Sequence, residues 1–125
     1  MAARHPTNIV LHQRSRQLEV SFDDGLGFRL SCEYLRVYSP SAEVRGHGPG
    51  QGVLQIGKED VSIRNVEPVG NYAVKLVFDD GHESGIYTWD YLYQLGRNQA
   101  DNWARYLEAL AAAGHARRDA DEGGR

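Results

Sequence analysis

Hydrophobic and polar residues alternate in two short stretches, residues 18–22 and 74–78. A period of two is typical of a strand with one buried face. The residues expected to face inward are Leu18, Val20, Phe22, Val74, Leu76 and Phe78. Similar β-rich patterns predict strands over residues 7–12 and 61–66. A turn from Pro68 to Asn71 is expected before the strand that ends at Phe78.

A weak internal repeat connects these stretches. Val20-Ser-Phe-Asp-Asp-Gly25 recurs as Leu76-Val-Phe-Asp-Asp-Gly81, and residues 31–35 recur as residues 88–92. Asp-Gly favours a tight hairpin reversal, because both residues tolerate positive φ. Each copy therefore predicts a strand, an Asp-Gly turn, a second strand and a short helix.

The predicted short helices carry capping signals. Ser31 and Thr88 stand where a hydroxyl can accept an orphan amide of the first turn. Glu33 and Asp90 follow, so that each helix has a carboxylate at the positive end of its dipole. Gly96 is the expected C′ residue that ends the second helix.

A third helix is predicted from about residue 100 to residue 113, ended by Gly114. It presents one apolar stripe, formed by Trp103, Tyr106, Leu107 and Leu110. We expect this stripe to cover the sheet, because a small domain needs every apolar stripe for its core. The alternative is a self-associating protein that uses the Trp103/Tyr106/Leu110 face as a dimer interface.

These elements predict one α+β domain, with an antiparallel sheet of about five to six short strands, two short helices and one C-terminal helix. The length of 125 residues suits a single core. No stretch approaches the roughly 20 apolar residues of a membrane span, and the N-terminus has no signal-peptide h-region. Because Cys32 is the single cysteine, it forms no internal disulfide, and a reducing cytoplasm is the expected compartment.

The charge pattern argues against nucleic acid as a partner. Fourteen Lys and Arg against 17 Asp and Glu give a net charge of −3, and no segment forms a concentrated basic stripe. The aromatic run from Tyr87 to Tyr93 therefore lacks the basic setting that base stacking needs, and we interpret it as packing.

Two further motifs are better explained by structure than by catalysis. Residues 52–58 match the first seven positions of a P-loop, but Glu59 stands where a Ser or Thr must reach magnesium. The pairs Asp23-Asp24 and Asp79-Asp80 each precede a glycine and are expected in turns. An enzyme that uses these carboxylates would lack a recognisable nucleophile–base pair.

Metal-capable side chains stand at no recognised ligand spacing. They are Cys32, His12, His47 and His82. A metal site would need further ligands, because zinc sites take four. The alternative to a metal-free protein is zinc or iron held by His82, His47 and an aspartate.

Several stretches together resemble a known family. They are Leu35-Arg36, the loop Ser39–Gln51, Gly57-Lys58, the segment Asp80–Tyr87 and Trp89-x-Tyr-Leu92. The set is similar to the small N-terminal domain of gamma-butyrobetaine hydroxylase-like oxygenases, which also occurs as a stand-alone bacterial domain of unknown function.

The likeness covers about residues 6–96. Residues 97–114 would then form a C-terminal helix packed on that domain, and residues 115–125 a flexible tail.

The resemblance implies an accessory role. In the oxygenases this domain precedes a catalytic jelly roll that carries iron and 2-oxoglutarate, and a chain of 125 residues cannot hold both. The same module also occurs joined to P-loop ATPases that carry iron–sulfur clusters. The implied protein is not an enzyme but a protein-binding module that serves an oxygenase or an iron–sulfur assembly partner.

The family can also hold a structural zinc with three cysteines and one histidine. The histidine matches His82, but the cysteines would fall on Ser39, Ser41 and Val44. The resemblance therefore implies no zinc site and no cofactor, and we expect His82 to hydrogen-bond the 39–52 loop instead.

The expected working surface is the 39–52 loop with the hairpin from Asp79 to Thr88. Loops carried on a rigid sheet are common contact sites. The residues predicted to bind are His82, His47, Arg45, Trp89 and Asp80.

Overall fold

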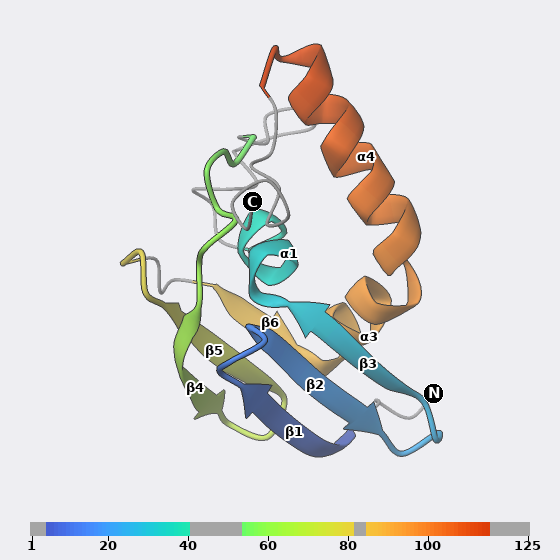
Figure 1. Cartoon of the computed structure of the whole chain (residues 1–125). Helices are drawn as coiled ribbons and strands as arrows, with labels where there is room; N and C mark the ends of the chain where they lie inside the picture. The colour runs from blue at the N-terminus through green and yellow to red at the C-terminus, as the bar shows by residue number, and fades with distance from the viewer. Residues whose placement is uncertain (1–4, 41–53, 82–84, 116–125) are drawn as a thin grey trace.

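Two β-β-β-α units are followed by a final helix (Figure 1). The computed structural model describes residues 5–40, 54–81 and 85–115. The first unit contains β1 (Pro6–His12), β2 (Gln17–Phe22), β3 (Gly27–Ser31) and α1 (Cys32–Val37). The second contains β4 (Ile63–Val69), β5 (Ala73–Phe78), β6 (Ile86–Thr88) and α3 (Trp89–Arg97), and α4 (Gln99–Ala112) completes the fold. The predicted α+β class and repeat are confirmed.

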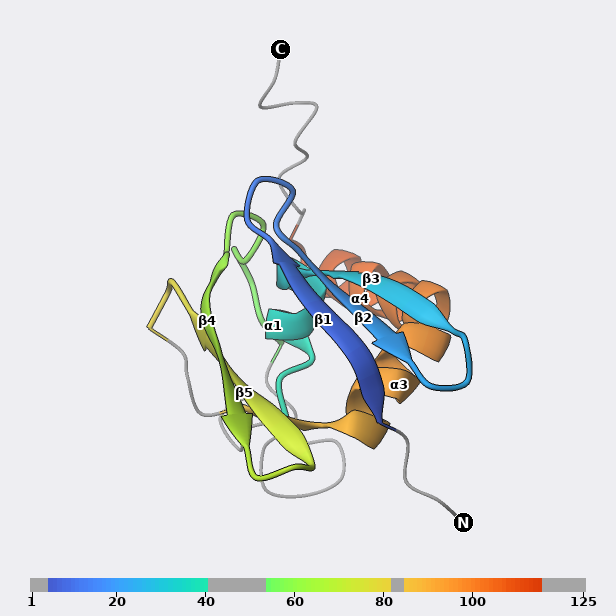
Figure 2. The ribbon, with the colours of Figure 1, turned by 90° about the horizontal axis from the view of Figure 1, so that it is seen from below.

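The six strands of the described residues form two antiparallel sheets, with the orders β1-β2-β3 and β4-β5-β6. The sequence pattern suggested one sheet, but each repeat unit completes its own meander before its helix begins. Figure 2 shows the sheets as two sides of a V with α1 between them. The Gln13 side chain donates to the Ile63 carbonyl oxygen across this gap, at 3.1 Å.

Helix α1 is the centre of the molecule, since all six of its residues are buried. It begins at Ser31, whose Oγ accepts the Tyr34 amide at 3.0 Å. In α3 the Thr88 Oγ1 accepts the Tyr91 amide at 3.1 Å. Both predicted N-caps are therefore confirmed. The sequence could predict them because capping depends only on residues that are close together along the chain.

The core fills the V between the sheets and α1. The six residues that alternation predicted to face inward are all buried, with Leu18, Val20 and Leu76 fully so. Their burial is the main source of stability in a domain of this size, at about 25 cal/mol for each Å² of apolar surface removed from water.

Strand β4 continues past the predicted end of its segment. The turn expected over Pro68–Asn71 is partly right, because Gly70 and Asn71 lie in the observed turn. Pro68 instead lies within β4, opposite Val74. This position tolerates proline because β4 is an edge strand, where a missing amide breaks no ladder on the outer side. The reversal comes at Gly70 instead, where φ is 53°.

The prediction that Gly96 ends the second helix is also wrong. Helix α3 continues to Arg97, and Asn98 is its C-cap. Gly96 lies against Phe28, and a Cβ at this position would overlap the Phe28 ring. A close approach between helix and strand, and not a turn, explains this glycine.

Helix α4 lies close to its predicted position, and Gly114 follows it with φ of 81°. Tyr106 and Leu110 are buried in a cluster with Val37, next to α1. The stripe therefore packs on α1 of its own chain, and the prediction that it covers the sheet is wrong. Leu107 is 41% exposed and does not belong to the buried face, which corrects the predicted stripe.

Tyrosine hydroxyls connect the three helices. Tyr34 donates to the Leu95 carbonyl oxygen at 2.7 Å, and Tyr91 donates to that of Tyr38 at 2.6 Å. Tyr38 in turn donates to the Asn102 carbonyl oxygen at 2.8 Å. Burial raises the pKa of Tyr34 to about 12, so that this link stays protonated at neutral pH.

Within the described residues, none of the helices combines the length and the apolar character that a membrane crossing requires.

Candidate functional site

The turn that follows β5 is fixed to the segment before β4. The Asp79 amide donates to the Ser62 carbonyl oxygen at 2.9 Å, and the Ser62 amide donates to Asp79 Oδ1 at 3.0 Å. Gly81 completes the turn with φ of 91°. Asp79 therefore has the turn-forming role that its sequence context predicts.

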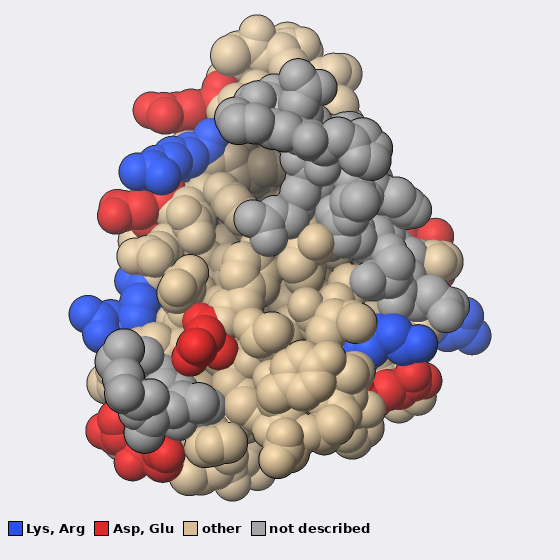
Figure 3. Space-filling view, turned by 180° about the vertical axis from the view of Figure 1, so that it is seen from behind, with Lys and Arg blue, Asp and Glu red and all other residues tan. Residues whose placement is uncertain are grey.

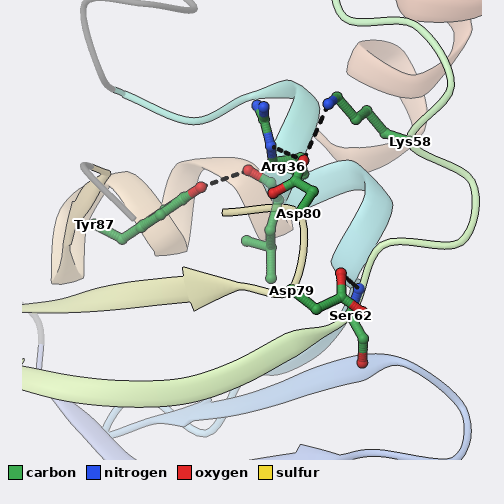
Figure 4. Close-up of polar contacts among 7 residues, drawn as sticks. Arg36, Lys58, Ser62, Asp79, Asp80 and Tyr87 are labelled. Carbon is green, nitrogen blue, oxygen red and sulfur yellow. Dashed lines mark hydrogen bonds and ion pairs between the residues drawn. The ribbon is translucent and has the colours of Figure 1, made fainter. Parts of the chain in front are cut away.

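Asp80 joins two cations from separate parts of the chain (Figure 4). Arg36 Nε donates to Asp80 Oδ2 at 2.9 Å, and Lys58 Nζ donates to the same oxygen at 3.0 Å. The Arg36 side chain is 9% exposed, against 22% for Lys58 and 25% for Asp80. Partial burial makes these pairs stronger than exposed surface pairs, because water screens them less.

The Arg36 guanidinium retains an unused donor. Its Nη1 is buried and has no hydrogen-bond partner among the residues that the structure describes. Such a group costs about 1–3 kcal/mol of desolvation. The cluster is not a positive patch, because Asp60 and Asp79 line the same hollow as Lys58 and Asp80.

Tyr87 holds β6 against α1. Its hydroxyl donates to the Leu35 carbonyl oxygen at 2.5 Å, and burial raises its pKa. Ser39 is fully buried nearby, in hydrogen-bond contact with Tyr87. A Cβ at Gly85 would overlap the Ser39 hydroxyl. The start of the predicted loop thus meets the hairpin, as the family resemblance implies.

The structure places two of the five predicted binding residues. Asp80 lies in the charged cluster, whereas Trp89 is half-buried and its Nε1 donates to the Asn71 carbonyl oxygen at 2.8 Å. Trp89 therefore fixes the β4–β5 turn. His82, His47 and Arg45 lie outside the described residues, as do Ser41 and Val44.

Sequence reasoning did not identify Arg36 and Lys58 as site residues. Lys58 ends the partial P-loop match, but the chain continues into β4, not into a helix N-terminus that could hold phosphate. The available signal was the family resemblance, since Arg36, Lys58 and Asp80 belong to three of the stretches that carry it. These stretches meet in one cluster.

Of the four zinc positions that the resemblance implies, the structure describes Ser39 alone, so the expected loss of the zinc site stays a prediction. Ser39 stands at a cysteine position, and its hydroxyl cannot replace a thiolate ligand. Cys32 is buried in the core, and desolvation raises its pKa, which favours the neutral thiol. His12 Nε2 lies 2.8 Å from Glu19 Oε1. In the described part of the chain no group of three or more His, Cys, Asp or Glu could hold a metal ion.

Metal binding by His82 and His47 stays a prediction, which elemental analysis of untagged protein tests.

The sequence matches the family model described as "Gamma-butyrobetaine hydroxylase-like, N-terminal" over residues 9–93. No curated protein matches it.

The chain is similar to several solved structures, among them two NMR solution structures and a crystal structure. One NMR solution structure has 56% identity and a TM-score of 0.79, and the match covers 92% of this chain and 86% of the other. A second NMR solution structure has 50% identity and a TM-score of 0.81, and the match covers 93% of this chain and 91% of the other.

The third is a crystal structure at 1.93 Å of a protein of unknown function from Acidithiobacillus ferrooxidans ATCC 23270. It is assigned to the DUF971 family. It has 43% identity to this chain and a TM-score of 0.63, and the match covers 74% of this chain and 92% of the other.

Proposed function

Because the chain belongs to the gamma-butyrobetaine hydroxylase-like N-terminal domain family, we propose that it is a non-catalytic accessory module that binds a protein partner. The partners to test first are an oxygenase and an iron–sulfur assembly protein, the two settings in which such domains occur. We keep the cytoplasm as the expected compartment, where the buried thiol of Cys32 stays reduced.

The observation that supports this proposal is the anchoring of β6, the strand that exposes Ile86, and of the turn that follows β5. The Arg36–Asp80 and Asp79–Ser62 contacts hold the described part of that turn, and the Tyr87 hydroxyl holds β6 against α1. Ile86 nevertheless remains 44% exposed on β6. A fixed backbone that presents an apolar side chain loses little conformational entropy on binding.

The surroundings of Ile86 suit a protein interface. Tyr72 is 52% exposed, and its carbonyl oxygen accepts the Trp89 amide, which places it beside the start of α3. Lys75 lies opposite Ile86 on β5 and forms an ion pair with Glu67, so charged groups border this side chain. Figure 3 shows that uncharged atoms form most of the lower described surface in the back view. Aromatic and apolar groups with a charged rim are typical of protein interfaces.

Binding of the purified chain to each candidate partner tests the proposal, measured by isothermal titration calorimetry. The decisive variant is Ile86→Glu, which places a charge in the proposed contact. Its matched control is Leu26→Glu, because Leu26 is 40% exposed and lies just before β3, the strand of the first repeat unit that corresponds to β6.

We expect Ile86→Glu to weaken binding at least tenfold, as truncated interface hot spots do, while Leu26→Glu binds like the wild type. Both variants should fold, because both side chains are exposed. The proposal is wrong if neither partner binds, or if the two variants have the same effect.

A further inference from the structure

Each of the two sheets has two outer strands, and the four outer edges are not protected equally. An open strand edge presents unpaired amides and carbonyl oxygens, so proteins usually block such edges. In β4, Pro68 offers no amide, and the Val66 amide donates to Asn65 Oδ1 at 3.0 Å. In β3, the Arg29 carbonyl oxygen accepts Gln99 Nε2 at 3.2 Å, and β6 is only three residues long.

Strand β1, with seven residues, is the fourth outer strand. On the neighbouring strand the Phe22 amide donates to the carbonyl oxygen of the residue before β3, so the Phe22 backbone points away from β1. Backbone direction alternates along an antiparallel strand, so Glu19 points toward β1, where its register partner is Val10. The residues on either side of Val10, Ile9 and Leu11, therefore direct their amides and carbonyl oxygens away from β2.

The middle of β1 lacks the features that block the other edges. Among the described residues, no strand pairs with β1 on its outer side, and no side chain hydrogen-bonds the backbone of Ile9 or Leu11. Residues 8–12 contain neither proline nor Lys, Arg, Asp or Glu. The protective features of β1, Pro6 and the bulge between Pro6 and Asn8, lie at its first residues. Residues 8–12 therefore form an open edge with two amides and two carbonyl oxygens available for pairing.

An exposed backbone edge selects another extended backbone, because a strand offers donors and acceptors at matching intervals. The arrangement of the two sheets favours a single strand over a second copy of the chain. Gln13 reaches from the end of β1 to the Ile63 carbonyl oxygen at the start of β4, and the two strands diverge from there (Figure 2). Neighbouring strands lie about 4.8 Å apart. A second copy would have to place its whole sheet where one glutamine side chain reaches β4.

We propose that β1 binds an extended peptide segment of a partner protein, which adds a fourth strand antiparallel to β1. The segment pairs its backbone with Ile9 and Leu11. Paired residues place their side chains on the same face of a sheet, and Ile9 and Leu11 pack against the core. The segment therefore carries apolar residues at the two paired positions, with one residue between them beside Val10. The proposal does not rest on the protein-binding function above, because Ile86 lies on the other sheet.

The full chain is titrated with the peptide acetyl-Lys-Thr-Val-Thr-Ile-Thr-Lys-amide and followed by ¹H–¹⁵N correlation NMR. The control is the same peptide N-methylated at its Val and Ile, which keeps the side chains and removes the two donors. We expect saturable shifts centred on residues 8–12, slower hydrogen exchange of the Ile9 and Leu11 amides, and binding at least about tenfold weaker with the methylated peptide. Equal binding of the two peptides, or no saturable shifts, overturns the proposal.

Ile9→Pro removes one outward amide and leaves the ladder between β1 and β2 intact. Ile9→Ala is the matched control, because it shortens the side chain and keeps the amide. We expect Ile9→Pro to bind the peptide about tenfold more weakly than Ile9→Ala, and equal affinities overturn the proposal. If Ile9→Pro does not fold, the two peptides on the wild type decide. Ile86→Glu should bind the peptide like the wild type, and loss of binding there overturns the location of the site.

Sedimentation velocity distinguishes a partner segment from a second copy of the chain. We expect the protein to sediment as a monomer and to bind the peptide at a ratio of one to one. A dimer that the peptide dissociates would show that β1 pairs with a second copy, and this result overturns the assignment to a partner segment.

Discussion

Replacing Gly96 with alanine has two opposing effects: it favours the helical backbone of α3, and it places a Cβ against the Phe28 ring. Alanine favours an α-helix over glycine by about 1 kcal/mol, so the substitution would stabilise α3 taken alone. In the structure its Cβ would overlap the Phe28 ring. That ring has little freedom to move, because it packs edge to face on Tyr93 at 5.6 Å and on Phe22 at 6.1 Å.

Overpacking of this kind costs typically about 1–3 kcal/mol. After the helix gain is subtracted, we expect Gly96→Ala to lower the free energy of unfolding by up to about 2 kcal/mol. Urea denaturation followed by far-UV circular dichroism measures this change. The control is the difference between Gln94→Ala and Gln94→Gly, because Gln94 is exposed in the same helix and reports the helix preference alone.

A second substitution tests the cause. Phe28→Leu removes the ring, so it should reduce or abolish the penalty of Gly96→Ala when the two are combined. A double-mutant cycle measures this coupling, which we expect to reach about 1 kcal/mol or more. If Gly96→Ala stabilises the protein, or if the penalty is independent of Phe28, the assignment of Gly96 to a close helix–strand contact is wrong.

Three further predictions follow from burial. The pKa of Tyr34 is raised from 10.0 to about 12, so above pH 10 the unfolded state releases this proton first and stability falls by about 2 kcal/mol by pH 12. Tyr34→Phe should therefore lose less stability at alkaline pH than the wild type, and urea denaturation at pH 7 to 11.5 measures the difference. If the unfolding free energies of the two proteins change with pH in the same way, the raised pKa of Tyr34 is wrong. The Cys32 thiol is fully buried, so Ellman's reagent should label it only as fast as the protein opens, and rapid labelling of the native state would refute its burial. Leu110→Ala should cost about 2–4 kcal/mol of unfolding free energy, whereas Leu107→Ala, at an exposed site, should cost less than ~1 kcal/mol; equal losses would contradict the observed face of α4.

The features that sequence predicted well depend on neighbouring residues. Alternation over residues 18–22 determines which side chains face inward, and the hydroxyls of Ser31 and Thr88 cap helices that begin at the next residue. The internal repeat predicted the same order of elements in both copies, with two strands joined by an Asp-Gly turn and then a short helix. Physical rules of short range were sufficient for these features.

The failures depend on contacts between distant residues. Gly96 was assigned to a helix end because nothing nearby in sequence shows that Phe28 lies against it. Asp80 was identified as a site residue, but its partners Arg36 and Lys58 are 44 and 22 residues away. No periodicity reports such pairs, and only the motif stretches of the family indicated that these residues belong together.

The central position of α1 makes the two halves of the repeat unequal. Glu33 and Val37 are buried, whereas the residues aligned with them in the second copy, Asp90 and Gln94, are exposed. Replacing the α1 sequence with that of α3 would therefore put solvent-facing residues into the core. A saturation library should accept many amino acids at Asp90 and Gln94 and few at Glu33 and Val37, so the two copies of the repeat are similar in sequence but not interchangeable.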